Sequence, residues 1–195
     1  MTLSISVLSG DDLEDALPDL ARLRIEVFRA FPYLYDGDLA YEQKYLAALV
    51  NARDPIIVAA RDGDRIVGCA TGSALDASHS EFAAPLKDAG VDPTETFYCA
   101  ESVLLAGYRG RRIGHAFFDH REAHARTQGF KRSCFCAVVR PGDHPMRPAD
   151  YSPLDPFWRG RGYSPLKGAV ARFSWKDLGQ PEETEKPMQV WIRNL

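Results

Sequence analysis

The stretch between residues 96 and 128 constrains the fold of this chain more than any other. An apolar run, TFYCAESVLL, predicts a strand that leads directly into AGYRGRRIG, where three glycines mix with three arginines. The run after it has helical spacing and ends at Gly129, a typical helix stop. N–H groups at the start of a helix have no partner within the helix, and glycine lets a ligand approach them. We therefore expect a strand, an anion-binding loop and a helix, in that order.

The rest of the chain predicts short strands and helices in an irregular order. Pro18 predicts a new turn or segment inside the first helix, Pro32 predicts its end, and Asp62-Gly63 predicts a hairpin turn. The predicted elements are a strand over 3–9, helices over 10–31 and 38–52, a hairpin over 55–75, a loop with one short helix over 76–95, a strand over 132–140, a proline-rich loop over about 141–156, a short helix, and two strands over 168–178 and 186–195. We expect a single mixed α/β domain over residues 1–195, whose proline-rich loop is long enough to act as a lid.

Composition and charge exclude several classes of protein. The chain has 195 residues, of which 45% are hydrophobic and 26% charged, which is typical of a folded globular domain. A net charge of −3 argues against a nucleic-acid-binding module that would use the arginines within 109–112 and 159–161. No apolar run is long enough to span a bilayer and the N-terminus lacks the features of a signal peptide, so we expect a cytoplasmic protein. The four cysteines lack metal-ligand spacing and are expected to be buried, with Cys134 and Cys136 on one face of a strand.

The hexapeptide from Arg109 to Gly114 resembles the acyl-CoA loop of the GNAT N-acetyltransferase superfamily, whose pattern is Gln/Arg-x-x-Gly-x-Gly/Ala after a strand. Arg112 departs from this pattern, because it stands where the pattern has its first glycine, and a left-handed conformation there would be strained. The order of elements also follows the superfamily, and FWRGRGY over 157–163 is similar to its FYEKLGF-like ending. The resemblance implies a mostly antiparallel sheet flanked by helices, in which a splayed pair of strands holds acyl-CoA.

The resemblance also implies roles for particular residues. The backbone of Val103, Leu104 and Leu105 would hold the pantetheine arm, and Trp158 would take the place where family members put a tyrosine near the CoA sulfur. The residues that would bind the pyrophosphate are Arg109, Gly110, Arg111, Arg112, Ile113, Gly114, His115 and Ala116. Acetyl-CoA is the implied cosubstrate, and a homodimer is a possible assembly. The structural alternative is a basic, solvated loop that caps a core helix.

Acetyl transfer to an amine needs a base, because an ammonium group with a pKa of ~10.4 must first lose a proton. Glu101 is the first candidate, since it lies on the strand that leads to the loop. The alternative is a structural carboxylate paired with a neighbouring arginine. Tyr98 and Glu95 are further candidates, and the N–H of Leu104 is the expected donor to the thioester carbonyl.

The group that protonates the leaving thiolate is less well defined by the sequence. Trp158 has an indole N–H, which is a donor but a very poor acid. Tyr151 and Tyr163 are therefore the candidates, with solvent as the alternative.

The segment FPYLYDGDLAYEQKY gathers aromatic and acidic side chains, which together suit a cationic amine. The alternative is a set of half-buried tyrosines beside a solvated acidic turn. The side chains concerned are Tyr33, Tyr35, Tyr41, Tyr45, Asp36, Asp38 and Glu42. His120 and His124 have a metal-capable spacing but no third ligand in view, so we expect no metal. The sequence predicts an N-acetyltransferase acting on a primary amine of a small molecule or peptide, and the alternative is a non-catalytic CoA-binding or sensor protein of the same fold.

Overall fold

The protein, described by a computed structural model over residues 3–75 and 80–195, has its elements close to the predicted order. They are β1 (Leu3–Val7), α1 (Gly10–Phe28), α2 (Leu39–Val50), β2 (Ile56–Asp62), β3 (Arg65–Ala74), α3 (Ser80–Asp88), β4 (Thr96–Tyr98), β5 (Ser102–Leu104), α4 (Ile113–Thr127), β6 (Arg132–Val138), α5 (Asp155–Gly160), β7 (Ser164–Lys176) and β8 (Glu183–Asn194), with 3₁₀ turns η2 (Pro93–Glu95) and η3 (Ala106–Tyr108). Residues 76–79, the start of the polar segment predicted as a loop, lie outside the described residues.

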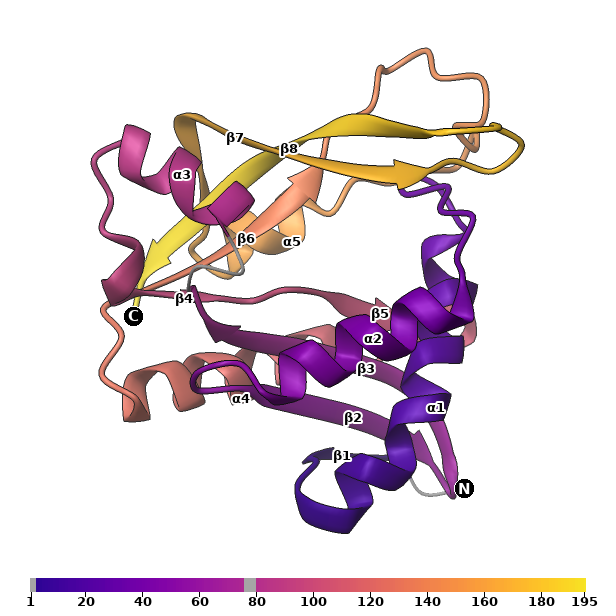
Figure 1. The fold of residues 1–195 in the computed structure, drawn as a ribbon, viewed down its shortest axis with the longest axis vertical. Helices are drawn as coiled ribbons and strands as arrows, with labels where there is room; N and C mark the ends of the chain where they lie inside the picture. Colours follow the sequence, from indigo (N-terminus) through magenta and orange to yellow (C-terminus); the bar gives the residue numbers. More distant parts are fainter. Residues whose placement is uncertain (1–2, 76–79) are drawn as a thin grey trace.

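The strands form one open sheet. Its order is β1-β2-β3-β4-β6-β8-β7, and β5 pairs with β3 next to β4. Among the described strands, the β4–β6 pair alone is parallel, and it joins Thr96–Tyr98 to Arg132–Cys134. Figure 1 shows that β1 to β5 form one half of the molecule and β6 to β8 the other. The predicted mixed α/β fold with a mostly antiparallel sheet is therefore confirmed.

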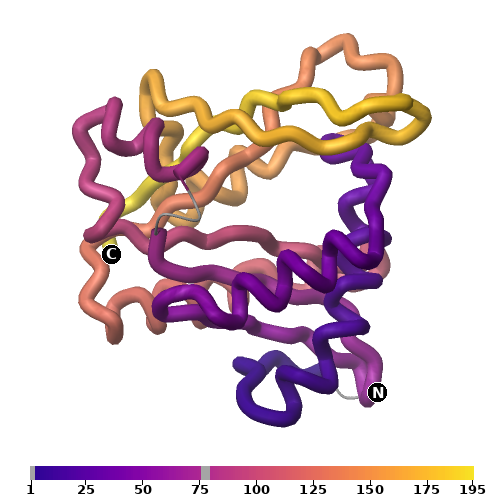
Figure 2. Tube along the Cα trace, viewed as in Figure 1, coloured from indigo at the N-terminus to yellow at the C-terminus, as the bar shows by residue number. Residues whose placement is uncertain are grey.

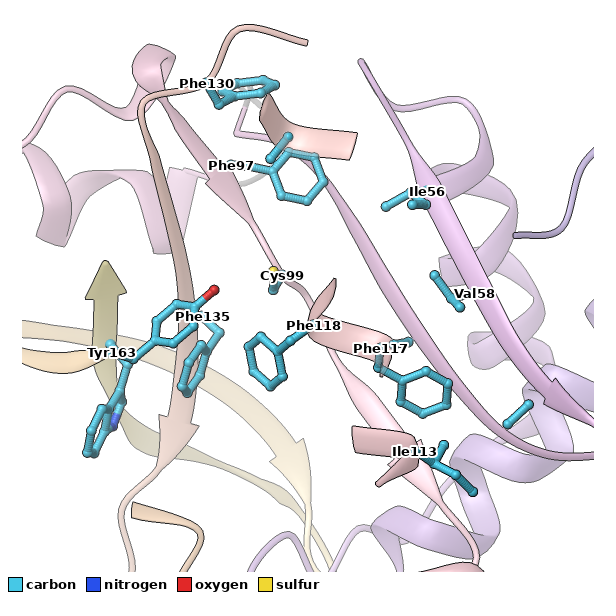
Figure 3. Close-up of a cluster of buried hydrophobic side chains, with 14 of the residues drawn as sticks. Ile56, Val58, Phe97, Cys99, Ile113, Phe117, Phe118, Phe130, Phe135 and Tyr163 are labelled. Carbon is cyan, nitrogen blue, oxygen red and sulfur yellow. The ribbon is translucent and has the colours of Figure 1, made fainter. Parts of the chain in front are cut away.

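The half of the sheet that contains β2 is covered on both faces, which explains the continuous apolar run IIVAA in this strand. Ile56 and Val58 belong to a core cluster with α4, whereas Ile57 and Ala59 belong to a second cluster with α1 and α2. In Figure 1, α1 and α2 lie in front of β2 and β3, and α4 lies behind them. Figure 3 shows Phe117 of α4 on the same side of β2 as Ile56 and Val58. The alternation of side chains along β2 thus fixes which helices cover each face.

A bulge divides the run predicted as one strand over 96–105. Two residues, Ala100 and Glu101, oppose the single residue Thr71: Ala100 N donates to Thr71 O at 3.1 Å, and Thr71 N donates to Glu101 O at 3.0 Å. Just before the bulge, Cys99 N still donates to Cys134 O of β6 at 2.8 Å. Beyond it, β5 pairs with β3 and not with β6, so the described part of the sheet opens between β5 and β6.

A buried arginine of α4 holds this bulge in place. The side chain of Arg121 is almost fully buried and donates from Nη1 to Thr71 O at 3.1 Å and to Glu101 O at 2.9 Å. Its Nη2 donates to Ser102 Oγ at 2.8 Å. One guanidinium group therefore ties the helix after the opening to the strands on one side of it.

The long hairpin of β7 and β8 reaches across to the segment that joins α1 and α2. Asp36 N donates to Lys176 O at 2.9 Å, and Leu178 N donates to Leu34 O at 2.7 Å. Figure 2 shows the tip of this hairpin beside residues 30–38, although the two segments are far apart in the sequence. This contact bridges the two halves of the open sheet.

Three local predictions can be compared with these elements. Asp62 pairs with Arg65, so the hairpin turn consists of Gly63 and Asp64, one residue later than predicted. Pro18 lies inside α1, which runs without a break to Phe28 and ends before Pro32. The two cysteines of β6 belong to one buried cluster, as predicted from their spacing.

Candidate active site

The start of α4 presents a row of backbone N–H groups without partners. Among the described residues, the six amides of residues 110–115 donate to no protein acceptor, whereas Arg109 N donates to Ala106 O at 3.1 Å and Ala116 N to Arg112 O at 3.2 Å. The side chains of the loop before the helix are exposed. Unpaired amides and the helix dipole both favour an anion here.

The backbone of this loop explains why its pattern calls for glycine. Gly110 has a φ of 76°, and Arg112, the N-cap of α4, has a φ of 63° and a ψ of 7°. The left-handed conformation predicted to be strained at Arg112 is therefore the one it adopts. Arg111 Nη2 donates to Gly107 O at 3.0 Å, and the side chain of Arg112 is exposed.

The two glycines of the loop leave open space over the helix start. A Cβ on Gly110 would meet no atom within 4 Å, and one on Gly114 would meet the ring of Phe157, with its nearest atom at 3.4 Å. The second distance is an ordinary contact, so the fold itself does not require glycine at 114. The residues present thus fit a ligand with phosphate groups that lies close to the backbone.

The opened edge of β5 leads from this loop to the bulge. Leu105 N donates to Val67 O of β3 at 3.0 Å. Because bonded pairs alternate along an antiparallel ladder, the N–H groups of Ser102 and Leu104 point away from β3. The described strands place no partner on that side of β5, while the side chain of Val103 is fully buried. This edge can therefore pair with an extended ligand.

A cavity of about 850 Å³ begins where this edge ends. Ala100 and Glu101 of the bulge line it, together with residues of α1, α2, α3 and the β7–β8 hairpin. All seven aromatic and acidic side chains predicted as an acceptor site are in its lining: Tyr33, Tyr35, Asp36, Asp38, Tyr41, Glu42 and Tyr45. Its volume is in the range of sites for small molecules.

Glu101 lies at the inner end of the cavity in a cluster of buried charges. Arg24 of α1 forms ion pairs with both Glu101 and Glu42, and Tyr45 Oη donates to Glu101 Oε2 at 2.9 Å. Burial opposes the charge of Arg24, but the carboxylates of Glu101 and Glu42 outweigh it and raise the pKa of Arg24 well above its usual value. Burial, and then the charge of Glu101, raise the pKa of Tyr45 well above its usual value. The structure thus shows the arginine pairing that was the alternative interpretation of Glu101.

The sequence interpretation missed Arg24. The signal that could have identified it is a charged residue on the apolar stripe of α1, where Leu20, Leu23 and Phe28 are buried at helical spacing. A charge at such a position needs a buried partner.

The residues predicted as proton donors lie apart from the cavity lining. Tyr163 is buried in the core, as Figure 3 shows, and its hydroxyl lies 3.1 Å from Glu122 Oε1 and 2.9 Å from Ser133 Oγ. Burial raises the pKa of Tyr163 far above its usual value. A buried hydroxyl with these partners stabilises the core, so we do not retain Tyr163 in the site.

Trp158 and Tyr151 lie on the segments that follow β6. The Trp158 ring packs against Phe135 and Trp191, with centroid distances of 5.0 and 5.1 Å. Tyr151 belongs to the proline-rich loop, and its ring contacts Phe31 edge-on with a centroid distance of 4.7 Å.

The two further candidates for the base differ in position. Glu95 lies before β4 and pairs with Lys131 and Arg132, outside the cavity lining. Tyr98 lines the cavity, and burial raises its pKa well above its usual value. Of the carboxylates predicted as a base, Glu101 alone is at the cavity.

Residues 3–75 and 80–195 contain no group of three or more potential metal ligands, and the ring of His124 lies 3.1 Å from Asp54 O. None of the helices in these ranges is both long and apolar enough to cross a membrane.

This chain is similar in sequence and in structure to known proteins. The model of the acetyltransferase (GNAT) family matches residues 19–148, and no curated protein sequence matches the chain. Ribosomal-protein-alanine N-acetyltransferase from Brucella melitensis is similar in structure, with a TM-score of 0.63, 13% identity, and coverage of 98% of this chain and 99% of that one. A GCN5-related N-acetyltransferase from Kribbella flavida has a TM-score of 0.60, 14% identity and coverage of 99% and 98%. PaiA N-acetyltransferase from Thermoplasma acidophilum, solved with coenzyme A, has a TM-score of 0.57, 11% identity and coverage of 100% of both chains.

Proposed function

Because the chain belongs to the acetyltransferase (GNAT) family, we propose that it transfers the acetyl group of acetyl-CoA to a primary amine bound in the cavity beside Glu101. One observation carries the proposal. Residues 100–115 contain, in order, the bulge that lines the acidic cavity, the open edge of β5 and the free amides at the start of α4. A cosubstrate with phosphates at one end and a thioester at the other suits such a line.

Acetyl-CoA, when bound, supplies an activated acetyl group as a thioester. The amides of Gly110 to His115 would hold its pyrophosphate, with Arg109 and Ala116 at the two ends of the loop. Of Val103, Leu104 and Leu105, Leu104 would hold the pantetheine arm through its outward-facing N–H, while Val103 and Leu105 bond to β3 and would keep this edge in place. Trp158 of α5 would lie near the sulfur. The thioester end of the cosubstrate would then lie at Ala100 and Glu101, where the cavity begins.

The chemistry requires that the amine lose a proton as its nitrogen bonds to the acetyl carbon. Glu101 would accept this proton, directly or through one water, and the N–H of Leu104 would donate to the carbonyl oxygen. As the C–N bond forms, the C–S bond breaks and the sulfur takes up one proton. The products are an amide and a thiol, so atoms and charges balance. Tyr151 remains a candidate for the proton donor to the sulfur, with solvent as the alternative.

The setting of the enzyme belongs to the same proposal. The acceptor is a small molecule or a peptide with a primary amine, and the loop over about 141–156 acts as a lid of a single domain over residues 1–195. The enzyme is cytoplasmic and forms a homodimer, which sedimentation at several concentrations would test.

Substitution of the base tests the catalytic part of the proposal. Glu101→Gln should leave CoA binding within about threefold and lower kcat by about 10²-fold or more, because general base catalysis contributes factors of this size. Release of free thiol with a panel of amines measures kcat, and calorimetry measures CoA binding.

The matched control is Glu42→Gln, which removes the other carboxylate that pairs with Arg24 and leaves the bulge before β5 unchanged. An equal loss of kcat in both variants would assign the effect to the Arg24 cluster and not to a base. CoA binding by the wild type without thiol release for any amine would instead favour a non-catalytic CoA-binding protein.

Substitution in the loop tests the cofactor part. Gly114→Asp would add a carboxylate in the open space over the helix start, where its charge would repel a pyrophosphate. We expect CoA affinity to fall by about 10²-fold or more with an unchanged unfolding temperature, because a Cβ at residue 114 makes only an ordinary contact with the Phe157 ring. Gly142→Asp adds the same charge in open space on the proline-rich loop and should bind CoA normally. Equal CoA affinities in the two variants would show that the loop before α4 does not bind the pyrophosphate.

A further inference from the structure

We propose that the acceptor is a small molecule with two positive charges, one on the amine that reacts at Glu101 and one held near the cavity mouth by Glu81, Glu183 and Tyr41. This inference rests on the proposed function, since it specifies the substrate class of the same site.

The cavity lining carries far more negative than positive charge. Six carboxylates line it against two cations, which leaves four negative charges in excess. The carboxylates come from four separate parts of the chain: Asp36, Asp38, Glu42, Glu81, Glu101 and Glu183. In a chain whose whole net charge is −3, so many converging carboxylates specify a cationic ligand.

One carboxylate of the lining is fully buried. Glu42 has no exposed surface, and the Arg24 guanidinium contacts its Oε2. Its Oε1 receives no hydrogen bond of good geometry within the described part of the chain, although Glu42 lies close enough to Tyr35 to add to the effect of burial in raising the pKa of that tyrosine. Such a carboxylate attracts a cation strongly, because little water screens its charge.

The two cations of the lining are already used. Arg24 is shared between Glu42 and Glu101, and Lys176 Nζ lies 2.9 Å from Asp36 Oδ2. The inner end of the cavity therefore keeps about one negative charge, which a single ammonium group would balance.

The outer carboxylates are not used by the fold in this way. Over the described residues, Glu81 and Glu183 form no ion pair, and Asp38 caps α2 by accepting from Tyr41 N at 2.8 Å. Tyr41, Glu81 and Glu183 all line the cavity, and burial, the charge of Glu42 and then the charges of Glu183 and Glu81 raise the pKa of Tyr41. The Tyr41 side chain is 46% exposed. A second cation could contact this ring face and the two glutamates at once.

The space between the two ends suits an apolar spacer. Phe82 of α3 stacks on Tyr98 and on Phe173 of β7, with centroid distances of 4.9 and 5.7 Å, and all three rings line the cavity. A monovalent amine would leave the outer carboxylates unbalanced, and an anionic acceptor would meet only repulsion. A short diamine satisfies both ends.

The test compares amines of matched length. The probes are 1,4-diaminobutane and 1,5-diaminopentane against n-butylamine and n-pentylamine, each assayed by thiol release with acetyl-CoA. We expect kcat/KM to favour the diamines by about tenfold or more, and the preference to fall as salt rises. The double variant Glu81→Gln/Glu183→Gln should bring the ratio of diamine to monoamine close to one. Glu185→Gln, on β8 and paired with the exposed Arg172, is the control that should keep the ratio.

Failure of this inference and failure of the proposed function give different results. Equal kcat/KM for diamines and monoamines, or an unchanged ratio in the double variant, would overturn the inference of a dicationic acceptor. The proposed acetyltransferase function would still stand. Absence of thiol release with every amine would overturn the proposed function. Calorimetry with 1,5-diaminopentane would then still test whether the cavity binds a dication. Binding to the wild type and to Glu185→Gln, but not to the double variant, would support a dicationic ligand. Absence of binding to the wild type would overturn it.

Discussion

At the scale of single residues, the N-cap of α4 shows why the acyl-CoA loop pattern has glycine at the position of residue 112. The backbone of residue 112 is left-handed, with a φ of 63°, and a left-handed conformation costs a residue with a side chain about 1–2 kcal/mol. Glycine avoids this cost. The amide of residue 112 is available to an anion whether the residue is glycine or arginine. Arg112 therefore adds a positive charge beside the amides at the expense of stability.

Arg112→Gly should raise the free energy of unfolding by about 1 kcal/mol, since the strain is relieved and the extra entropy of unfolded glycine offsets part of the gain. CoA affinity should fall by less than about tenfold, because one exposed charge is lost while the amides remain. Urea unfolding and calorimetry measure the two quantities.

Arg111→Gly is the matched comparison for this prediction, because Arg111 does not have a positive φ. It should lower stability slightly, as glycine does at ordinary backbone angles. A loss of stability in Arg112→Gly would mean that the Arg112 side chain contributes more than its backbone costs.

At the scale of elements, the opening of the sheet depends on close packing of β3 against β4 and β5. A Cβ on Gly72 would lie 2.6 Å from the Phe97 ring and 2.9 Å from Tyr98 O, and one on Gly68 would lie 2.6 Å from Leu104 Cδ1. Real Cβ atoms do not come this close to a backbone oxygen, so position 72 requires glycine, whereas at position 68 the end of the flexible Leu104 side chain has to move. Together with Arg121, these glycines let the strands follow one another across the bulge.

Gly72→Ala should therefore lower the free energy of unfolding by about 1–3 kcal/mol, as overpacking in a core does. Gly107→Ala is the control, because its Cβ would meet nothing within 4 Å. Urea unfolding of both variants measures the difference. Equal stability of the two alanine variants would show that β3 can shift to make room.

Some of these elements could be predicted from the sequence and others could not. Clean periodicity predicted the helices over 10–31 and 38–52 and the apolar strand β2, because burial of one stripe or of both faces leaves a local pattern. The bulge at Ala100 and Glu101 leaves no such pattern, since it depends on Thr71 and on Arg121. The aromatic and acidic residues of the predicted acceptor site could be identified because all seven lie within residues 31–45. Glu81 and Glu183 reach the same cavity only through the fold.

At the scale of the whole molecule, the cavity lies between two halves of the sheet whose strands are joined by one short ladder. The parallel β4–β6 ladder has three residue pairs. A second connection lies at the hairpin, where Arg140 donates to Tyr33 O at 2.8 Å and pairs with Asp177 at 2.8 Å. Burial alone would raise the pKa of Asp177, but the hydrogen bonds and charge of Arg140, with those of Lys186, hold it below its usual value.

This pairing makes the connection between the halves sensitive to acid. A carboxylate whose pKa is lower in the folded protein stabilises it fully above the unfolded value, near 3.8, and loses this effect as pH falls through the lower folded value. Asp177→Asn should cost about 2 kcal/mol at pH 7, the scale of a charge-assisted hydrogen bond. The difference from the wild type should start to shrink near pH 4, where the unfolded chain takes up the proton, and should vanish below the lower folded pKa, where the folded carboxylate is protonated as well.

Thermal and urea unfolding at pH 7, 5 and 3 measures this difference, and Asp19→Asn serves as the comparison because its pair with Arg22 is exposed and should contribute little. A difference for Asp177→Asn that stays constant from pH 7 to pH 3 would show that the charge of Asp177 is not what stabilises the hairpin contact. If the difference shrinks as expected, diamine affinity should be weaker in the variant even at pH 7. Lys176, Glu183 and Trp175 of the same hairpin line the cavity, so their positions depend on this connection.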